Sequence, residues 1–392
     1  MKSSHRIPPF LRAGPIQLLT IGVLMVGGVL GMIAVNGAVL VGEGQFQINQ
    51  PLLAGGITVA MTAALLLVTA AVRPVRIHLE YKPFNRSWGL FVAWAYILAG
   101  YALMAFNLIR LDVPTLLFES PGYIAFRLTE EHGAVIYYTT MLCFFVGASF
   151  ALDIVRNRHV KRLIVLSIII FGFGLLALTR REMLILIFLW GFIYLFTRKK
   201  VNVAIVVTIG TIFVAAIFIT TIVFRHIDVT DSPMGYFLSG EFEPYRFALF
   251  LIDNWIREGG VFYSPWSFAI PFADGETLSQ STNCVLVQDF LHNSTCLGSF
   301  TITVFAAFLY FGFVIPIAFY LFTVWCAKQS AHFLDHRDGA FATFIYAFFL
   351  LRLVLFIRNG ELFDSLIDSI VLVVLLFIFF VATGWKAARL ER

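Results

Sequence analysis

Ten apolar stretches constrain this sequence more than any other feature, because each can be interpreted as a membrane-spanning helix. A crossing takes about 20 apolar residues, since every backbone N–H and C=O must be bonded within the segment once it enters hydrocarbon. The stretches are 16–41, 52–72, 88–109, 134–154, 163–179, 182–197, 201–224, 298–325, 340–357 and 366–385. The first has no small-residue cleavage site after it, so we expect a retained helix and not a signal peptide.

The composition leads to the same fold class. Apolar residues make up 60% of the 392 residues and charged residues only 13%, whereas a soluble domain is nearer half apolar and a quarter charged. We therefore predict a polytopic, all-α integral membrane protein with a single domain over residues 1–392. The net charge of +5 does not indicate a nucleic-acid partner, because no basic run is longer than Arg198-Lys199-Lys200.

The distribution of basic residues predicts the orientation. With the N-terminus in the cytoplasm, 19 of the 28 Lys and Arg residues and five of the 23 acidic residues fall on the cytoplasmic side. Cytoplasmic loops of membrane proteins carry such an excess of Lys and Arg. We therefore predict an even number of spans, with both termini in the cytoplasm.

One outer loop is much larger than the others and covers residues 225–297, between the seventh and eighth spans. Residues 245–258 within it have helical character and place Arg246, Asp253 and Arg257 on one face, which is typical of an interfacial helix. Cys284 and Cys296 also lie in this loop, either as a disulfide bridge in an oxidising compartment or as two free thiols.

The basic residues on the outer side are nine, and all are arginines. They are Arg110, Arg127, Arg180, Arg181, Arg225, Arg246, Arg257, Arg352 and Arg358. The guanidinium fork suits phosphate and carboxylate groups. Two interpretations stay open: several of these arginines converge on one anionic ligand, or they form structural ion pairs.

Two of these arginines lie at the tip of a predicted hairpin. Residues 163–197 would form a helix of about 52 Å, and because both ends are basic the stretch must turn back. Thr179 and Glu182 form a capping box, which places Arg180 and Arg181 at a helix N-terminus where anions are favoured. The alternative is that the two arginines pair with Glu182 and a nearby acid.

Arg352 lies inside the ninth stretch, about two turns from its outer end, and Arg358 follows in the short outer turn. A charged residue within a membrane span is a candidate functional residue. Asp368 lies near the start of the tenth stretch. The alternative function for Arg352 is therefore a salt bridge to Asp368 that orients two spans.

Candidate general bases occur in the large loop, where Glu241, Glu243, His226 and His292 could each accept a hydroxyl proton. The sequence does not select one of them. It contains no Walker A motif, H-E-x-x-H motif or CxxC pair. We therefore expect no metal site and no cofactor.

Three places give the chain a resemblance to a known family over roughly residues 163–370. They are Thr179-Arg180-Arg181-Glu182, then Gly240-Glu241-Phe242, and then Ser299 to Phe313, with Tyr310-Phe311-Gly312 entering a span, followed by Arg358-Asn359-Gly360-Glu361-Leu362. In these places the chain resembles the bacterial O-antigen and capsule repeat-unit polymerases. Many relatives read Arg-Gly-acid at the last of these places.

The resemblance implies a metal-independent glycosyltransferase of the bacterial inner membrane. Its fold would be GT-C-like, with about ten spans and one large periplasmic loop. Its substrates would be undecaprenyl-diphosphate-linked oligosaccharide repeat units, and a chain-length-regulating copolymerase would be a partner. Charge grows on the diphosphate leaving group in the transition state, and preorganised arginines stabilise such charge. Arg180, Arg181, Arg352 and Arg358 would bind the diphosphate, and Glu241, Glu243 and Arg246 would be catalytic.

Two other functions stay open. An O-antigen ligase uses the same donor but transfers the polymer to lipid A-core as acceptor, and His226 or His292 would suit that enzyme. A transporter or flippase for lipid-linked sugars would usually have more spans and an internal repeat, and we find no repeat.

Overall fold

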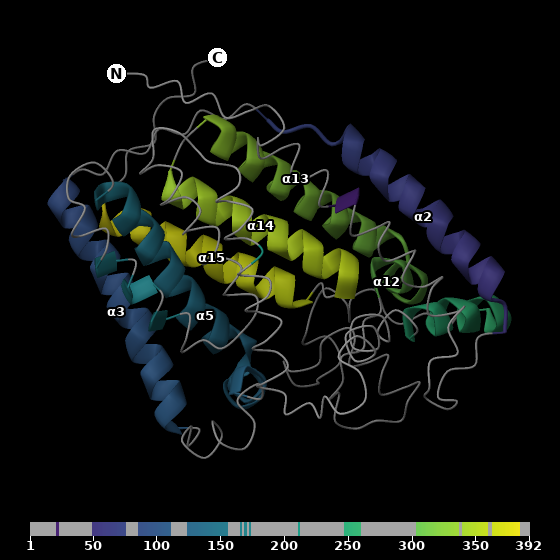
Figure 1. Ribbon diagram of the computed structural model, residues 1–392, viewed down its shortest axis with the longest axis horizontal. Helices are drawn as coiled ribbons and strands as arrows, with labels where there is room; N and C mark the ends of the chain where they lie inside the picture. Colours follow the sequence, from purple (N-terminus) through teal and green to yellow (C-terminus); the bar gives the residue numbers. More distant parts are fainter. Residues whose placement is uncertain are drawn as a thin grey trace.

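The protein is described here from a computed structural model that covers residues 21–22, 49–75, 85–110, 124–155, 165–166, 168–170, 172–173, 211, 247–259, 303–336, 339–359 and 363–384. Within these residues every regular element is a helix (Figure 1). The helices are α2 (Pro51–Ala71), α3 (Arg86–Arg110), α5 (Ile124–Val155), α12 (Thr303–Phe311), α13 (Val314–His336), α14 (Ala340–Asn359) and α15 (Phe363–Ala382). A further helical segment covers 247–258.

Five helices among the described residues are long and apolar enough to cross a membrane. They are Leu52–Ala71, Arg86–Phe106, Tyr138–Val155, Val314–Leu334 and Ala340–Ile357, and Asp368–Ala382 is a shorter apolar helix. The prediction of an all-helical membrane protein is therefore confirmed for this part of the chain. The predicted spans 16–41, 163–179, 182–197 and 201–224 lie largely outside the described residues.

The predicted span 298–325 is wrong. In its described part the chain forms two helices, α12 and α13, which are separated at Gly312. The φ angle of Gly312 is 79°, a left-handed conformation that ends a helix and that glycine adopts without a Cβ clash. Tyr310 and Phe311 therefore end α12, and the membrane-spanning helix is α13. The apolar pattern did not predict the full length of α13, because this helix continues beyond residue 325 and through Lys328.

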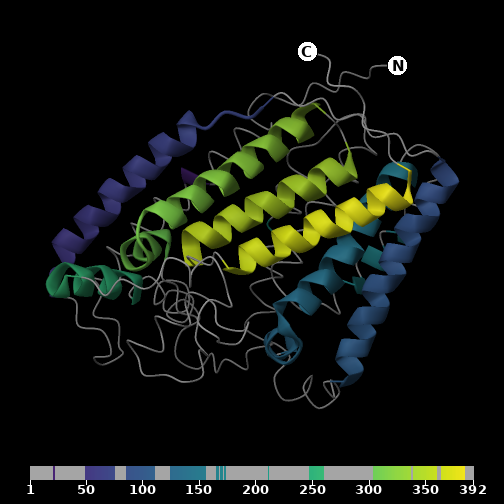
Figure 2. The same ribbon diagram turned by 180° about the vertical axis from the view of Figure 1, so that it is seen from behind.

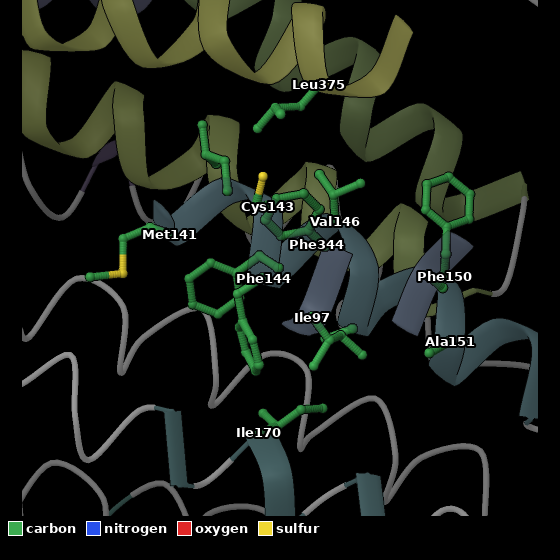
Figure 3. Packing of buried hydrophobic residues seen from close by; sticks show 14 of the residues in the cluster. Ile97, Met141, Cys143, Phe144, Val146, Phe150, Ala151, Ile170, Phe344 and Leu375 are labelled. Atoms are coloured by element: carbon green, nitrogen blue, oxygen red, sulfur yellow. The ribbon is translucent and has the colours of Figure 1, made fainter. Parts of the chain in front are cut away.

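The helices α13, α14 and α15 lie side by side, with α3 and α5 on one flank and α2 on the other (Figures 1 and 2). Apolar side chains from α3, α5, α14 and α15 form one buried cluster. Figure 3 shows part of it, with Phe144 and Phe150 from α5, Phe344 from α14 and Leu375 from α15. A second buried cluster combines α2, α12, α13, the 247–258 segment and the C-terminal half of α14. Helix α14 therefore contributes to both clusters.

A lysine from α13 binds the C-terminal end of α2. The Lys328 ammonium donates to the carbonyl oxygens of Thr69 and, at 2.7 Å, of Val72. Next to it, the Gln329 amide exchanges two hydrogen bonds of 2.8 Å with the backbone of Val75. The last carbonyls of a helix have no partner within the helix and carry partial negative charge, so a cation there is stabilising. This interaction explains why α13 includes a lysine.

Two other side chains connect helix ends on this same side. The Asp153 carboxylate of α5 accepts hydrogen bonds from the backbone N–H of Ala340 (2.6 Å) and Phe341 (3.0 Å), at the start of α14. The Trp88 indole N–H donates to the carbonyl oxygen of Ala382, at 2.7 Å, at the end of α15. One end of the bundle therefore contains two such pairs. They are the end of α5 with the start of α14, and the start of α3 with the end of α15.

Candidate functional site

The strongest candidate site is a buried ion pair between two membrane-embedded helices. The Arg352 guanidinium of α14 contacts the Asp368 carboxylate of α15 through its NH2 group. The exposed fractions are 3% for Arg352 and 0% for Asp368. The guanidinium carbon also lies 5.3 Å from the ring centroid of Tyr138 in α5 and 5.4 Å from that of Phe348. Three helices thus surround one cation.

The depth of this pair follows from its position in the helices. Arg352 precedes the last residue of α14 by seven positions, and Asp368 follows the first residue of α15 by five. With a rise of 1.5 Å per residue, the two side chains start about 10 Å and about 8 Å below the helix ends. Both charges therefore lie inside the ends of α14 and α15, within apolar helices.

The surroundings make each charge dependent on the other. Removing a charged group from water costs several kcal/mol, and the cost is recovered only through close pairing. The aromatic rings add about 0.5–2 kcal/mol of cation–π attraction. Since well-packed apolar side chains would often be at least as stable as a buried pair, this arrangement is more than a way to fill space. It holds a guanidinium in a fixed place near the end of the bundle where α14 ends and α15 begins.

The predicted salt bridge between Arg352 and Asp368 is thus confirmed. Arg358 belongs to the last turn of α14, but its side chain lies outside the described residues. The other predicted site residues also lie outside them: Arg180, Arg181, Glu241, Glu243, Arg246, His226, His292, Cys284 and Cys296. Of the predicted site, the structure brings together Arg352 and Asp368 and adds Tyr138, which the sequence did not indicate.

A second buried charge lies at the start of α2. The Asp253 carboxylate, fully buried, accepts hydrogen bonds from the backbone N–H of Asn49 at 3.0 Å and of Gln50 at 2.6 Å. It also accepts one from Arg257 Nε at 3.1 Å, and Arg257 donates a further bond to Asn254 Oδ1 at 3.3 Å. A negative charge at a helix N-terminus is favoured by the unbonded N–H groups and by the helix dipole.

The helix that carries Asp253 lies across the N-terminal end of α2 (Figures 1 and 2). Phe247, Leu251 and Ile252 belong to the second apolar cluster and are fully buried. The Tyr310 hydroxyl of α12 donates to the Leu251 carbonyl oxygen at 2.8 Å. The predicted helix over 245–258 is therefore confirmed for 247–258, and it is attached to α2 and α12 by specific contacts.

Two further observations concern metals and thiols. Within the described residues, no three His, Cys, Asp or Glu side chains come together in a group that could hold a metal ion. Cys143 and Cys326 are buried thiols, as expected for cysteines in apolar helices.

No family model, curated protein or solved structure matches this chain.

Proposed function

We propose that this protein is a metal-independent glycosyltransferase that joins undecaprenyl-diphosphate-linked oligosaccharide repeat units into a surface polysaccharide. It would work on the periplasmic face of a bacterial inner membrane, with a GT-C-like fold of ten spans and both termini in the cytoplasm. The proposal rests on the sequence resemblance. Of the arginines proposed to bind the diphosphate, Arg352 is the one whose side chain is described, and it lies buried near the end of α14 in contact with Asp368 and Tyr138.

A lipid diphosphate carries its charge where hydrocarbon meets the headgroups, and its polyprenyl tail stays among apolar side chains. Arg352 lies near one end of apolar helices, and α2, α3 and α15 expose large apolar side chains on their outer faces. A guanidinium that is already fixed by a carboxylate and a ring needs little reorganisation when charge develops beside it. The apolar outer faces suit the polyprenyl tail, and Arg352 would bind the diphosphate by exchanging its contact with Asp368 for one with the phosphate oxygens.

The proposed reaction transfers the growing chain to a new repeat unit. A hydroxyl oxygen of the new unit attacks the anomeric carbon of the donor sugar and forms a C–O bond. The bond between that carbon and the diphosphate oxygen breaks, and its electron pair leaves on undecaprenyl diphosphate. Glu241 or Glu243 takes the hydroxyl proton, and Arg246 is the third catalytic residue. Arg180, Arg181, Arg352 and Arg358 stabilise the leaving charge.

A gel of surface polysaccharide from the deletion strain tests this function, with the strain complemented by wild type or by Arg181→Ala. Loss of the ladder with survival of a single repeat unit on its acceptor supports a polymerase. Failure of Arg181→Ala to restore the ladder, at wild-type protein amount, places that arginine in the mechanism. Loss of every repeat with polymer accumulating on the lipid carrier means a ligase instead, and an unchanged ladder refutes both.

A further inference from the structure

We infer that Asp368 of α15 acts in product release, because its carboxylate competes with undecaprenyl diphosphate for Arg352 and displaces this product after each transfer. The inference rests on the proposed function, which assigns the diphosphate to Arg352. In the structure the Asp368 carboxylate contacts the Arg352 guanidinium, and the exposed fractions are 0% and 3%. An anion that binds Arg352 therefore has to compete with a carboxylate that is already in place.

Asp368 differs from Asp253 and Asp153 in the groups that hold its carboxylate. Asp253 and Asp153 each accept hydrogen bonds from two successive backbone N–H groups, and these donors stay in place as long as the helices do. Within the described part of the chain, the oxygens of Asp368 accept no hydrogen bond, and they contact the side chain of Arg352. Asp368 therefore depends on a partner that can turn to another anion.

The rings beside Arg352 limit where that other anion can bind. The guanidinium carbon lies 5.3 Å from the ring centroid of Tyr138 and 5.4 Å from that of Phe348. The faces of these rings are electron-rich, so they attract the cation but repel an anion. The N–H donors of a guanidinium lie in its plane, and Asp368 already contacts one of these donor groups. A phosphate bound to Arg352 therefore lies close to the Asp368 carboxylate or takes its place.

Both arrangements weaken the binding of undecaprenyl diphosphate. A buried carboxylate that has lost its counter-ion is strongly destabilised, and a carboxylate that stays beside the phosphates repels them. Once the lipid has left, Arg352 pairs with Asp368 again and both effects disappear. Since product release limits the turnover of many enzymes, a buried carboxylate beside Arg352 speeds the reaction by lowering the affinity for the leaving group.

A binding experiment with the full chain purified in detergent tests this competition, with undecaprenyl diphosphate as the probe. Asp368→Asn removes the charge and keeps the size of the side chain, so we expect it to bind the probe at least about tenfold more tightly than the wild type, chiefly through slower dissociation. Asp368→Glu keeps the carboxylate and should bind about as the wild type does. Asp153→Asn is the matched control, because it removes the same charge at the other end of α14 and should leave the affinity unchanged. Equal affinities of the wild type and Asp368→Asn would overturn the inference.

Thermal unfolding in detergent covers the case in which Asp368→Asn is poorly stable. Without the probe this variant should unfold at a lower temperature than the wild type, because Arg352 has lost its counter-ion. Saturating undecaprenyl diphosphate should raise its unfolding temperature by more than it raises that of the wild type, because the phosphates replace the missing carboxylate and a tighter ligand stabilises more. A variant that stays unstable, or that cannot be recovered, with this lipid present throughout purification would overturn the inference.

Elongation in inner-membrane vesicles separates release from the other steps, with the lipid-linked repeat unit extracted from the deletion strain as substrate. We expect Asp368→Asn to lower the maximal rate per molecule by about tenfold and also to lower the donor concentration that gives half of it. An unchanged or higher half-saturating concentration would contradict the competition. A wild type that does not bind undecaprenyl diphosphate would refute the proposed function, whereas a wild type that binds it no more weakly than Asp368→Asn would refute the role of Asp368 alone.

Discussion

Arg352 and Asp368 depend on each other, because neither charge is tolerated among apolar helices without its partner. Arg352→Gln or Asp368→Asn alone leaves one buried charge without its counter-ion, and such losses cost about 3–5 kcal/mol. We therefore expect each single variant to lower both the unfolding temperature in detergent and the amount of inserted protein. Unfolding temperatures equal to that of the wild type would contradict the close pairing seen between α14 and α15.

The exchanged pair, Arg352→Asp with Asp368→Arg, separates stability from function. It keeps one positive and one negative group at the same depth, so it should recover much of the stability that either single variant loses. If Arg352 binds the diphosphate, the exchanged protein inserts but restores no ladder in the deletion strain. Recovery of both the protein and the ladder would mean that the pair only orients the two helices.

The sequence could predict this pair but not the contacts of Asp253. Arg352 and Asp368 lie on either side of one short turn, so their depths can be counted from the same point. Asp253 binds backbone groups 203 and 204 positions away, and no local pattern relates these segments. The same holds for Asp153 and the start of α14, which are 187 positions apart. Almost every residue has a backbone N–H group, so a contact with such a group does not require any particular residue type at the donor position. The sequence therefore does not indicate these long-range contacts.

At the scale of elements, the crossing of α3 and α5 depends on a glycine. A Cβ added at Gly147 would lie 2.6 Å from the Ala93 carbonyl oxygen and 2.8 Å from Tyr96 Cβ. Small residues allow such close backbone approach between membrane helices. We expect Gly147→Ala to destabilise the protein by about 1–3 kcal/mol, as overpacking usually does. The measurement is thermal unfolding in detergent.

Gly56 of α2 is the matched control for this substitution. A Cβ there would meet nothing within 4 Å, and alanine is a better helix former than glycine by about 1 kcal/mol. Gly56→Ala should therefore be neutral or slightly stabilising. An equal loss of stability in both variants would mean that the close approach of α3 and α5 does not limit the fold.

Hydropathy predicted α2, α3, α14 and α15, which are apolar over most of their length, and the Tyr138–Val155 part of α5. It failed for 298–325, where a left-handed glycine divides the stretch and a lysine bound to another helix extends it. A sliding apolar window cannot detect either feature. The apolar surface decides that a helix forms, whereas backbone conformation and capping contacts decide where it begins and ends.

At the scale of the whole molecule, the contacts at the helix ends relate distant crossings. Asp153 near the end of α5 binds the start of α14, so the chain between them returns to the side that it left. Trp88 at the start of α3 likewise binds the end of α15. The end of α5, the start of α14, the start of α3 and the end of α15 therefore belong to the same side of the bundle.

The orientation of the molecule can be tested with two exposed positions at opposite ends of α2. Glu258 lies in the helix at the start of α2, and Val75 follows its end. If the end that carries Lys328 faces the cytoplasm, Glu258→Cys should react with a membrane-impermeant maleimide in intact cells. Val75→Cys should react only after the cells are opened, because Leu52–Ala71 is long enough to separate the two sides. Wild type gives the background from the native cysteines. The reverse pattern would invert the molecule and place Arg352 near the cytoplasmic face, which would contradict the proposed reaction because that reaction needs Arg352 near the periplasmic face.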